Sequence, residues 1–399
     1  MKKFLANFLL TYIKFFAKIQ LNKVRLIQKI KKQPLVTIGI TGSTGKTSTL
    51  QACQSALSSH FTIKTNQGYN SETGLPLSLL NLKITNYNLF FWFLILILAP
   101  IKILINWQSY QLLILEMGID SPKWPKNMDY LLSITNIDIA IILNITSVHL
   151  VNFKSIDQLA QEKLKLANQA KTVIINPNDK LIKKYNTNKN TIEIIPTKIK
   201  MDNYYLPQIY QLTFGAATTL AKTLNIPLNQ AIKNIKDNLI LPPSRSSILK
   251  GTKDTTIIDS SYNSSPLATK ELLDFLATFK SKKIAVLGDM RELGKKSQDE
   301  HIKIYQQAIK SADIIISVGP ETKKYFASKA NNFKNWWTAL DFLKTQLKGK
   351  ETILVKGSQN TIYLEELVKS ILKNSSDSQK LCRQSPYWLK VKAKFKQEN

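Results

Sequence analysis

Residues 35–50 read LVTIGITGSTGKTSTL, and they predict the fold of the first half of the chain. An apolar β-type run, 35–40, leads directly into a glycine-rich loop and then into a helical segment. Glycines let such a loop wrap a phosphate with its backbone N–H groups, and the following helix N-terminus adds positive partial charge. We therefore predict a phosphate-binding loop made by Gly42, Ser43, Thr44, Gly45, Lys46, Thr47 and Ser48.

Within this loop, Lys46 is expected to reach the β- and γ-phosphates of a nucleotide, and Thr47 to ligate Mg²⁺. The spacing departs from the common G-x-x-x-x-G-K pattern, because position 40 is isoleucine and Gly39 lies one residue too early.

Outward from the loop, short apolar runs alternate with helical segments. Runs at 35–40, 112–117, 139–145 and 172–176 are continuous, as in a parallel sheet buried on both faces, and a second series follows at 255–259, 283–289, 313–319 and 352–357. We predict an α/β fold: a central P-loop-type ATPase domain with a parallel sheet, then a Rossmann-like α/β C-terminal domain. Pro242-Pro243 suggests the boundary between these two domains. We expect a basic helix at 1–33, the central domain at 34–245, the C-terminal domain at 246–375 and a basic tail at 376–399.

Composition narrows the functional class. The 399 residues are 44% hydrophobic and 21% charged, which excludes global disorder. Lys and Arg number 56 against 27 Asp and Glu, a net charge of +29, and residues 1–33 hold nine basic and no acidic side chains. Such an excess suits a polyanion: a membrane, a phosphorylated substrate or nucleic acid. Two cysteines, Cys53 and Cys382, exclude a disulfide framework and point to a reducing compartment.

Two apolar segments suggest contact with a membrane surface. Residues 4–21 place Leu5, Phe8, Leu9, Tyr12, Phe16 and Ile19 at helical spacing, which favours an amphipathic helix on an anionic membrane. The alternative is a helix that docks on the protein's own body. Residues 89–107 hold 13 uninterrupted apolar residues, too few for a span, so we expect an interfacial or re-entrant segment, or else a buried core hairpin. A single crossing would also separate the phosphate loop from Glu116.

The loop sequence TGSTGKT and further motifs along the chain resemble the Mur ligase family. The resemblance extends over roughly residues 35–370 and is closest to the branch that adds D-alanyl-D-alanine to UDP-muramoyl-tripeptide. The motifs are NSETGLP (70–76), EMG (116–118), NITSVHL (144–150), QEKLK (161–165), DSSYNSSP (259–266), GDMRELG (288–294) and KGS (356–358).

This resemblance implies an ATP-dependent amide-bond ligase of peptidoglycan synthesis that works through an acyl phosphate. It implies catalytic roles for Lys46, Glu116, His149 and Lys163. The ligands of Mg²⁺, expected as two ions, would be Thr47, Glu116, His149 and a carbamylated Lys163. The register of the motif selects Lys163 rather than Lys165. His149 alone would be as well explained by packing of a loop, and His60 and His301 are expected at the surface.

The same resemblance assigns binding residues. Asn144, Arg245 and Asp259 would contact the nucleotide, and Asn70, Tyr262, Asn263 and Lys356 the substrates. Lys356 also follows a strand, at the sheet edge where open α/β sheets bind ligands. Two alternatives remain: Ser261 or Asn263 caps a helix, and Arg245 is a surface arginine.

The sequence departs from the family in several places. Ser260 stands where a second aspartate is usual, Gln359 replaces the arginine after Lys-Gly-Ser, and Pro207-Gln208 and Gln211 lie where an adenine-side His-Asn stretch is usual. Before the phosphate loop we find the basic helix and not the domain that grips the uridine end of the substrate. These departures leave open a related ligase with another amino acid or a lipid-linked acceptor, and a non-catalytic nucleotide-binding scaffold.

We therefore expect a cytoplasmic monomer, peripheral on the inner face of the cell membrane, with UDP-muramoyl-peptide, D-alanyl-D-alanine and an anionic membrane surface as partners. Nucleic acid is not expected, because no nucleic-acid-binding module is recognised.

Overall fold

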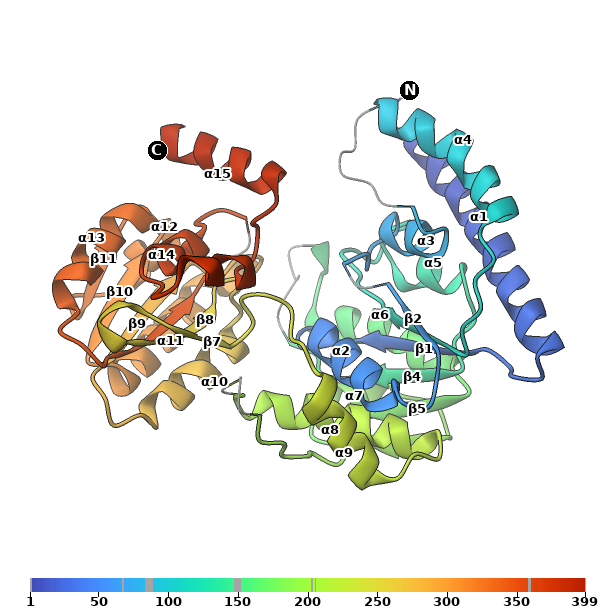
Figure 1. Cartoon of the computed structure of the whole chain (residues 1–399), viewed down its shortest axis with the longest axis horizontal. Helices are drawn as coiled ribbons and strands as arrows, with labels where there is room; N and C mark the ends of the chain where they lie inside the picture. The colour runs from blue at the N-terminus through green and yellow to red at the C-terminus, as the bar shows by residue number, and fades with distance from the viewer. Residues whose placement is uncertain are drawn as a thin grey trace. The chain divides into compact units, whose positions relative to one another are not determined.

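The computed structural model describes residues 2–66, 68–82, 89–146, 152–201, 204, 206–357 and 360–398 (Figure 1). The chain forms two compact units. The first comprises the chain up to Ile199 together with Gln211–Leu239, and the second comprises Lys200–Tyr210 and the chain from Ile240 onward. The division falls a few residues before Pro242-Pro243, and the return of Lys200–Tyr210 to the second unit was not expected from the sequence.

A six-stranded parallel sheet forms the centre of the first unit, in the order β2-β3-β1-β4-β5-β6. Strand β1 lies between β3 and β4, and the strand order reverses there, because β2 and β3 lie on one side of β1 and β4, β5 and β6 on the other. The carboxyl end of β1 is therefore the switch point at which open α/β sheets bind ligands. The strands are β1 (Val36–Thr41), β2 (Ile63–Thr65), β3 (Leu112–Glu116), β4 (Ile139–Ile142), β5 (Thr172–Ile175) and β6 (Thr191–Glu193).

Helices cover this sheet because their apolar positions recur at helical spacing. In α6, for example, Leu159, Lys163 and Leu166 lie on the buried face, and the side chain of Ser155 caps the first turn by accepting from Gln158 N. The helices of the first unit are α1 (Lys2–Ile30), α2 (Lys46–Leu57), α3 (Gly74–Leu79), α4 (Leu89–Ile105), α5 (Met128–Leu132), α6 (Ile156–Gln169), α7 (Lys180–Tyr185), α8 (Ile209–Thr223) and α9 (Leu228–Asn238).

Helices α1 and α4 lie side by side (Figure 1). The Tyr12 hydroxyl donates to the carbonyl of Leu96 at 2.7 Å, and the Lys23 amine donates to the carbonyl of Ile103 at 2.7 Å. The buried face of α1 packs on α3 and α4 and consists of Leu9, Ile13, Ala17, Leu21 and Val24.

The alternative for the N-terminal helix is therefore confirmed: α1 docks on the protein's own body. Phe8, one of the apolar residues predicted for this helix, is 51% exposed and lies outside the buried face.

Helix α4 is neither a buried hairpin nor a span. Ile95 and Ala99 pack into the core, whereas Phe93, Ile97 and Ile101, spaced four residues apart, form an exposed stripe. Among the described residues we find no helix with the length and apolar character needed to cross a bilayer.

The second unit contains another six-stranded sheet, in the order β11-β10-β9-β12-β8-β7, in which β7 runs antiparallel to β8 and the other pairs are parallel. Its strands are β7 (Ser247–Lys250), β8 (Thr256–Ser260), β9 (Lys283–Gly288), β10 (Ile314–Val318), β11 (Ala330–Phe333) and β12 (Thr352–Lys356). Its helices are α10 (Pro266–Ala277), α11 (Ser297–Ser311), α12 (Pro320–Tyr325), α13 (Trp336–Gln346), α14 (Leu364–Ser370) and α15 (Pro386–Glu398), with short 3₁₀ turns η2 (Thr252–Asp254), η3 (Gly294–Lys296) and η4 (Ser375–Lys380).

The predicted α/β class, with a parallel sheet in the first part and a second α/β sheet after it, is confirmed. The basic tail differs from a solvated end of the chain, because Arg383 and Lys392 are buried against α14.

Candidate functional site

The phosphate loop joins β1 to α2, and its backbone requires glycine at two positions. Gly42 has φ 155° and Gly45 has φ 83°, both in the region that side chains avoid. A Cβ atom on Gly42 would also lie 3.0 Å from Leu143 Cβ. Helix α2 starts at Lys46, and the first N–H groups of a helix have no acceptor within that helix. The loop can therefore present N–H groups to an anion.

Asn144, at the end of β4, holds the loop in this shape. Its Oδ1 accepts from Thr44 N at 2.9 Å, its Nδ2 donates to the carbonyl of Thr44 at 3.2 Å, and its own carbonyl accepts from Ser43 N at 2.8 Å. The Asn144 amide thus binds the loop backbone and fixes its shape.

Glu116 ends β3 beside the loop and is only 3% exposed. Its Oε2 accepts from the Thr47 hydroxyl at 2.9 Å, and its Oε1 accepts from Asn70 Nδ2 at 2.9 Å. The backbone of Glu116 is fixed as well, because Asn66 accepts from its N–H at 2.7 Å and donates to its carbonyl at 2.9 Å. Asn66 was missed in the sequence, where only the residues from Asn70 onward matched a motif.

Two lysine amines meet at one carbonyl oxygen of the loop. Lys46 Nζ donates to the carbonyl of Gly42 at 3.0 Å, and Lys163 Nζ donates to it at 3.2 Å. Lys163 is 1% exposed, and its burial, together with the Lys46 charge, holds its pKa well below the ordinary lysine value. Lys165, in contrast, lies at the surface, where it pairs with Asp129 at 2.6 Å and Glu162 at 2.8 Å. The geometry agrees with the choice of Lys163.

The oxygen donors beside the loop fit Mg²⁺. Thr47 and Glu116 supply one hydroxyl and one carboxylate in direct contact, and Mg²⁺ is commonly held by one or two such groups together with waters and phosphates. Across the described ranges, which omit 147–151, no three His, Cys, Asp or Glu side chains cluster as a metal site. His149, predicted as a further ligand, lies outside the described residues.

In the second unit, the candidate residues gather where β8 and β12 end. Asp259 is fully buried and accepts from Ser261 N at 3.0 Å, and its Oδ2 has no hydrogen-bond partner among the described residues. Burial raises the pKa of Asp259. Lys356 donates to the carbonyl of Asn263, and burial, with the nearby Arg245 charge, lowers the pKa of Lys356 to about 7.

Arg245 and Tyr262 stack beside this buried pair. The guanidinium of Arg245 lies 4.5 Å from the centre of the Tyr262 ring, and its Nε has no hydrogen-bond partner among the described residues. Asn263 is exposed and its Oδ1 accepts from Ser264 N at 2.8 Å. An unpaired guanidinium nitrogen and a buried lysine suit an anionic ligand.

His301 was wrongly expected at the surface. It is fully buried in α11, where its Nε2 accepts from Met290 N at 3.0 Å and so fixes the loop after β9. Asp289 in the same loop accepts from Thr322 N at 2.8 Å, and burial raises the pKa of Asp289. The sequence places His301 11 residues after the Gly-Asp-Met motif at 288–290, and this spacing does not by itself predict burial.

The predicted residues thus form one set in each unit. Gly42, Ser43, Thr44, Gly45, Lys46, Thr47, Ser48, Asn70, Glu116, Asn144 and Lys163 belong to the first, and Arg245, Asp259, Tyr262, Asn263 and Lys356 to the second.

Comparison with known proteins agrees with this arrangement. Residues 40–233 match the Mur ligase middle domain and residues 244–359 match the Mur ligase, glutamate ligase domain. A UDP-N-acetylmuramoyl-tripeptide–D-alanyl-D-alanine ligase of Buchnera aphidicola subsp. Baizongia pistaciae is 30% identical over 374 residues, which cover 83% of this chain and 75% of the relative. The chain belongs to the Mur ligase family.

Membership of the Mur ligase family confirms the resemblance drawn from the motifs. The enzyme of the same name from Buchnera aphidicola subsp. Acyrthosiphon pisum is 28% identical over 385 residues, 86% of this chain and 78% of the relative. Among solved structures, the MurF ligase of Thermotoga maritima in complex with ADP superimposes with a TM-score of 0.72 at 21% identity, covering 90% of this chain and 82% of that one. The chain thus spans about three quarters of the length of its curated relatives and shares the MurF-like fold.

Proposed function

We propose that this member of the Mur ligase family is an ATP-dependent ligase that joins D-alanyl-D-alanine to a UDP-muramoyl-tripeptide in peptidoglycan synthesis. The observation that carries the proposal is the meeting of Lys46 and Lys163 at the phosphate loop, next to the Thr47–Glu116 pair. Relatives that cover most of this chain bear the name of this reaction.

The chemistry follows from charge. A carboxylate attacks the γ-phosphorus of ATP, ADP leaves, and the amine of the dipeptide then displaces phosphate from the acyl phosphate. Both reacting partners of the first step are anionic, so the site must neutralise them together. Lys46 and the N–H groups of the loop supply positive charge, and Thr47 and Glu116 would hold Mg²⁺. The ion would add positive charge beside the phosphates.

Lys163 requires a different role, because a charged lysine would be expensive at a fully buried position. Burial holds the pKa of Lys163 well below the ordinary lysine value, which favours the neutral amine, and a neutral amine can react with carbon dioxide to give a carbamate. The carbamate would turn a buried amine into an oxygen ligand, which with His149 would hold a second Mg²⁺. Intact-protein mass spectrometry in bicarbonate buffer tests this: Lys163→Met should lose the adduct and Lys165→Met should keep it.

Within the second unit, we assign Asp259 and Arg245 to the nucleotide, and Tyr262, Asn263 and Lys356 to the substrates. The buried Arg245 Nε, which has no hydrogen-bond partner among the described residues, supports an anionic ligand at this place.

The decisive experiment measures phosphate release from ATP with UDP-muramoyl-tripeptide, with and without D-alanyl-D-alanine, and the mass of the product. We expect dipeptide-dependent release and an amide product in the wild type and in Lys165→Ala, and loss of both in Lys46→Ala and Lys163→Ala. If turnover occurs instead with a lipid-linked acceptor or with another amino acid, the related-ligase alternative is correct. ATP binding without turnover on any acceptor would support the scaffold.

We also propose that the ligase acts while bound peripherally to the inner face of the cytoplasmic membrane, as a monomer. The outward stripe of α4, Phe93, Ile97 and Ile101, is unusually apolar for a surface: these side chains are 62%, 44% and 41% exposed. Phe8 and Phe15 of α1 and Trp107 after α4 are exposed as well.

Positive charge accompanies this apolar surface. Lys18, Lys29, Lys31 and Lys32 are exposed on α1 or just after it, and residues 1–33 contain no acidic side chain. An apolar stripe flanked by lysines is complementary to a bilayer with anionic headgroups, and each such lysine contributes on the order of 1 kcal/mol near the surface.

Vesicle flotation tests the membrane proposal with anionic and neutral lipid in parallel. Phe93→Ser/Ile97→Ser/Ile101→Ser should lower binding at least about tenfold, because apolar burial is lost. A matched control, Ile195→Ser/Ile240→Ser, removes two exposed isoleucines away from α4 and should bind as the wild type does. The proposal is wrong if the triple variant binds vesicles as well as the wild type does, or if binding depends on neither lipid charge nor salt concentration.

A further inference from the structure

Buried residues attach the tail of the chain to the second unit. Between η4 and α15, Leu381, Cys382 and Arg383 are buried, whereas Lys390 and Lys394 on α15 remain in solvent. A basic side chain near the end of a chain normally stays hydrated, because removing its charge from water costs energy. The burial of Arg383 therefore needs partners that hold it there.

Arg383 binds three separate segments through its planar fork. Its Nη2 donates to the carbonyl of Tyr262 at 2.6 Å, its Nε donates to Asn360 Oδ1 at 3.0 Å, and its Nη1 donates to Glu365 Oε2 at 3.1 Å. Tyr262 follows β8, Asn360 follows β12, and Glu365 lies in α14. The Arg383 guanidinium thus connects the segments that follow β8 and β12, where the candidate substrate residues lie.

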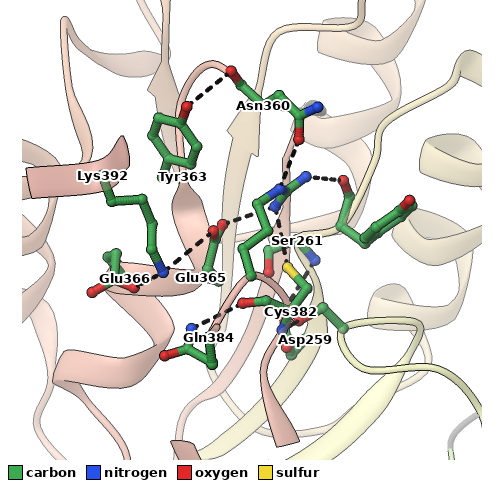
Figure 2. A network of polar contacts seen from close by, with 12 residues as sticks. Asp259, Ser261, Asn360, Tyr363, Glu365, Glu366, Cys382, Gln384 and Lys392 are labelled. Atoms are coloured by element: carbon green, nitrogen blue, oxygen red, sulfur yellow. Dashed lines mark hydrogen bonds and ion pairs between the residues drawn. The ribbon is translucent and has the colours of Figure 1, made fainter. Parts of the chain in front are cut away.

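The charge of Arg383 is balanced inside the unit. Glu365 is fully buried, and Lys392 of α15 approaches it at 3.8 Å while pairing with Glu366 (Figure 2). Two basic side chains of the tail therefore face two carboxylates of α14. Such a buried, hydrogen-bonded network fixes geometry, because each group must keep its partners.

Several residues of this region are held in a backbone conformation that non-glycine residues avoid. Ser244, Asn360, Tyr363 and Arg383 have φ of 58°, 60°, 55° and 54°. Hydrogen bonds stabilise this backbone conformation. Cys382 N donates to Ser244 Oγ at 3.0 Å. The Tyr363 hydroxyl donates to the carbonyl of Asn360 at 3.1 Å (Figure 2). Strained residues of this kind persist when surrounding contacts determine them, and they cluster at sites that bind ligands.

The Tyr262-Asn263 turn is the segment that these contacts restrain most. Arg383 holds the Tyr262 carbonyl, and the guanidinium groups of Arg245 and Arg383 lie 4.5 Å and 5.3 Å from the Tyr262 ring centre. Lys356 donates to the carbonyl of Asn263 on the other side of the turn. The exposed Asn263 side chain is thus presented on a turn with both carbonyls occupied.

We propose that Arg383 is a positioning residue of the ligase: through Tyr262 and Asn360 it holds the edge of the second unit in the shape that binds the substrate amine. This inference rests on the proposed function for the roles of Tyr262, Asn263 and Lys356. We assign Arg383 no contact with substrate, because its Nε, Nη1 and Nη2 all donate within the unit.

Steady-state kinetics of full-length Arg383→Lys and Arg383→Met test this role. Arg383→Lys keeps a positive charge opposite Glu365 but loses the fork that reaches Tyr262 and Asn360 together. We expect it to raise KM for D-alanyl-D-alanine at least tenfold, to leave KM for ATP within twofold, and to unfold at nearly the wild-type temperature. Arg383→Met should show the same KM change with a lower unfolding temperature.

The matched control is Lys380→Met, which removes a surface partner of Asp377 from the same tail and should leave both KM values unchanged. If Arg383→Lys has the wild-type KM for the dipeptide, Arg383 contributes only to the stability of the unit and the proposal is wrong.

Amide hydrogen exchange separates this proposal from the proposed function. The N–H groups of Ser261 and Tyr262 are bonded to Asp259 Oδ1 and to the carbonyl of Ser244. Both should exchange faster in Arg383→Lys, while amides of the phosphate loop stay as in the wild type. If the wild type makes no dipeptide product, the proposed function fails. The exchange rates then test whether Arg383 holds the Tyr262-Asn263 turn: faster exchange in Arg383→Lys supports this, and unchanged exchange overturns it.

Discussion

The carboxyl edges of the two sheets carry candidate residues that are held in different ways. In the first unit, the motif residues hold one another: Thr47 and Asn70 bind Glu116, and Asn144 binds the loop. In the second unit, residues of the motifs are fixed from outside, because Arg383 at the end of the chain binds both Tyr262 and Asn360.

This difference in support follows a difference in the motifs: the second unit departs from the family pattern at more of its motif positions than the first unit does. The site of the first unit keeps the quoted motif residues, and its support comes from these residues and from Asn66, four residues before the 70–76 motif. The second unit has Ser260 where a second aspartate is usual and glutamine at 359, and there a buried ion-pair network stabilises the strand ends. The comparison teaches that a site with an altered motif can depend on a segment far away in sequence.

The largest effect is expected from breaking that network. Glu365→Gln leaves Arg383 and Lys392 without their shared carboxylate in a buried place, and removing one partner of a buried ion pair destabilises a protein by about 3–5 kcal/mol. Urea unfolding followed by the tryptophans of the second unit measures this. The matched control is Asp377→Asn, at the surface pair with Lys380, which should lower stability by about 0–1 kcal/mol. Equal stability of the two variants would remove the basis of the comparison.

In the first unit, the corresponding change should act on the rate and spare the fold. Glu116→Gln keeps the hydrogen bonds to Thr47 and Asn70 possible but removes the charge, so we expect kcat to fall by about 10²–10³-fold. Raising the Mg²⁺ concentration should restore part of the rate. Asp129→Asn, on the exposed partner of Lys165, serves as control. A loss of folding in Glu116→Gln, in place of a loss of rate, would show that the carboxylate is structural.

The pH dependence of stability should reveal the buried lysine of the second unit. The pKa of Lys356 is lowered from 10.5 to about 7, so between these values the unfolded chain binds more protons than the folded one. The free energy of unfolding should therefore rise with pH across this window, by up to about 1.4 kcal/mol per pH unit. Lys356→Met should flatten this rise in urea titrations at pH 7, 8 and 9. A falling wild-type curve in that window would contradict the assignment.

The smallest effect is expected at the surface of the first unit. Lys165→Met breaks ion pairs with Asp129 and Glu162, yet the lysine side chain is 37% exposed, so stability should change by about 0–1 kcal/mol. Its turnover should equal that of the wild type, in contrast to Lys163→Met two residues away. Loss of turnover in Lys165→Met would show that the motif register was read wrongly.

Much of the fold could be predicted because buried parallel strands are continuous apolar runs. The eight predicted strands are present, and the four that were missed, β2, β6, β7 and β11, are the edge strands of the two sheets. Edge strands are short and half-exposed, so their sequences, such as Thr191–Glu193 and Ala330–Phe333, carry little apolar signal.

The candidate site followed the same division. The phosphate loop and Glu116 could be predicted from the sequence itself, since a glycine loop after a strand and a carboxylate at a strand end have local physical causes. Lys163 was predicted only by the register of the family motif at 161–165. Asn66, His301 and Arg383 could not be predicted, because each acts by a hydrogen bond to a residue brought near only by folding.

By itself, the sequence determined the α/β class, the nucleotide loop and the excess of positive charge at the chain ends, because these depend on periodicity, glycine placement and composition. Only the tertiary structure decided which face of α1 is buried and that the tail belongs to the second unit. It also decided that Lys163 and Lys356 are buried lysines with lowered pKa values. Burial, pairing and pKa depend on what lies within a few ångströms in space, and neighbours in space are set by packing.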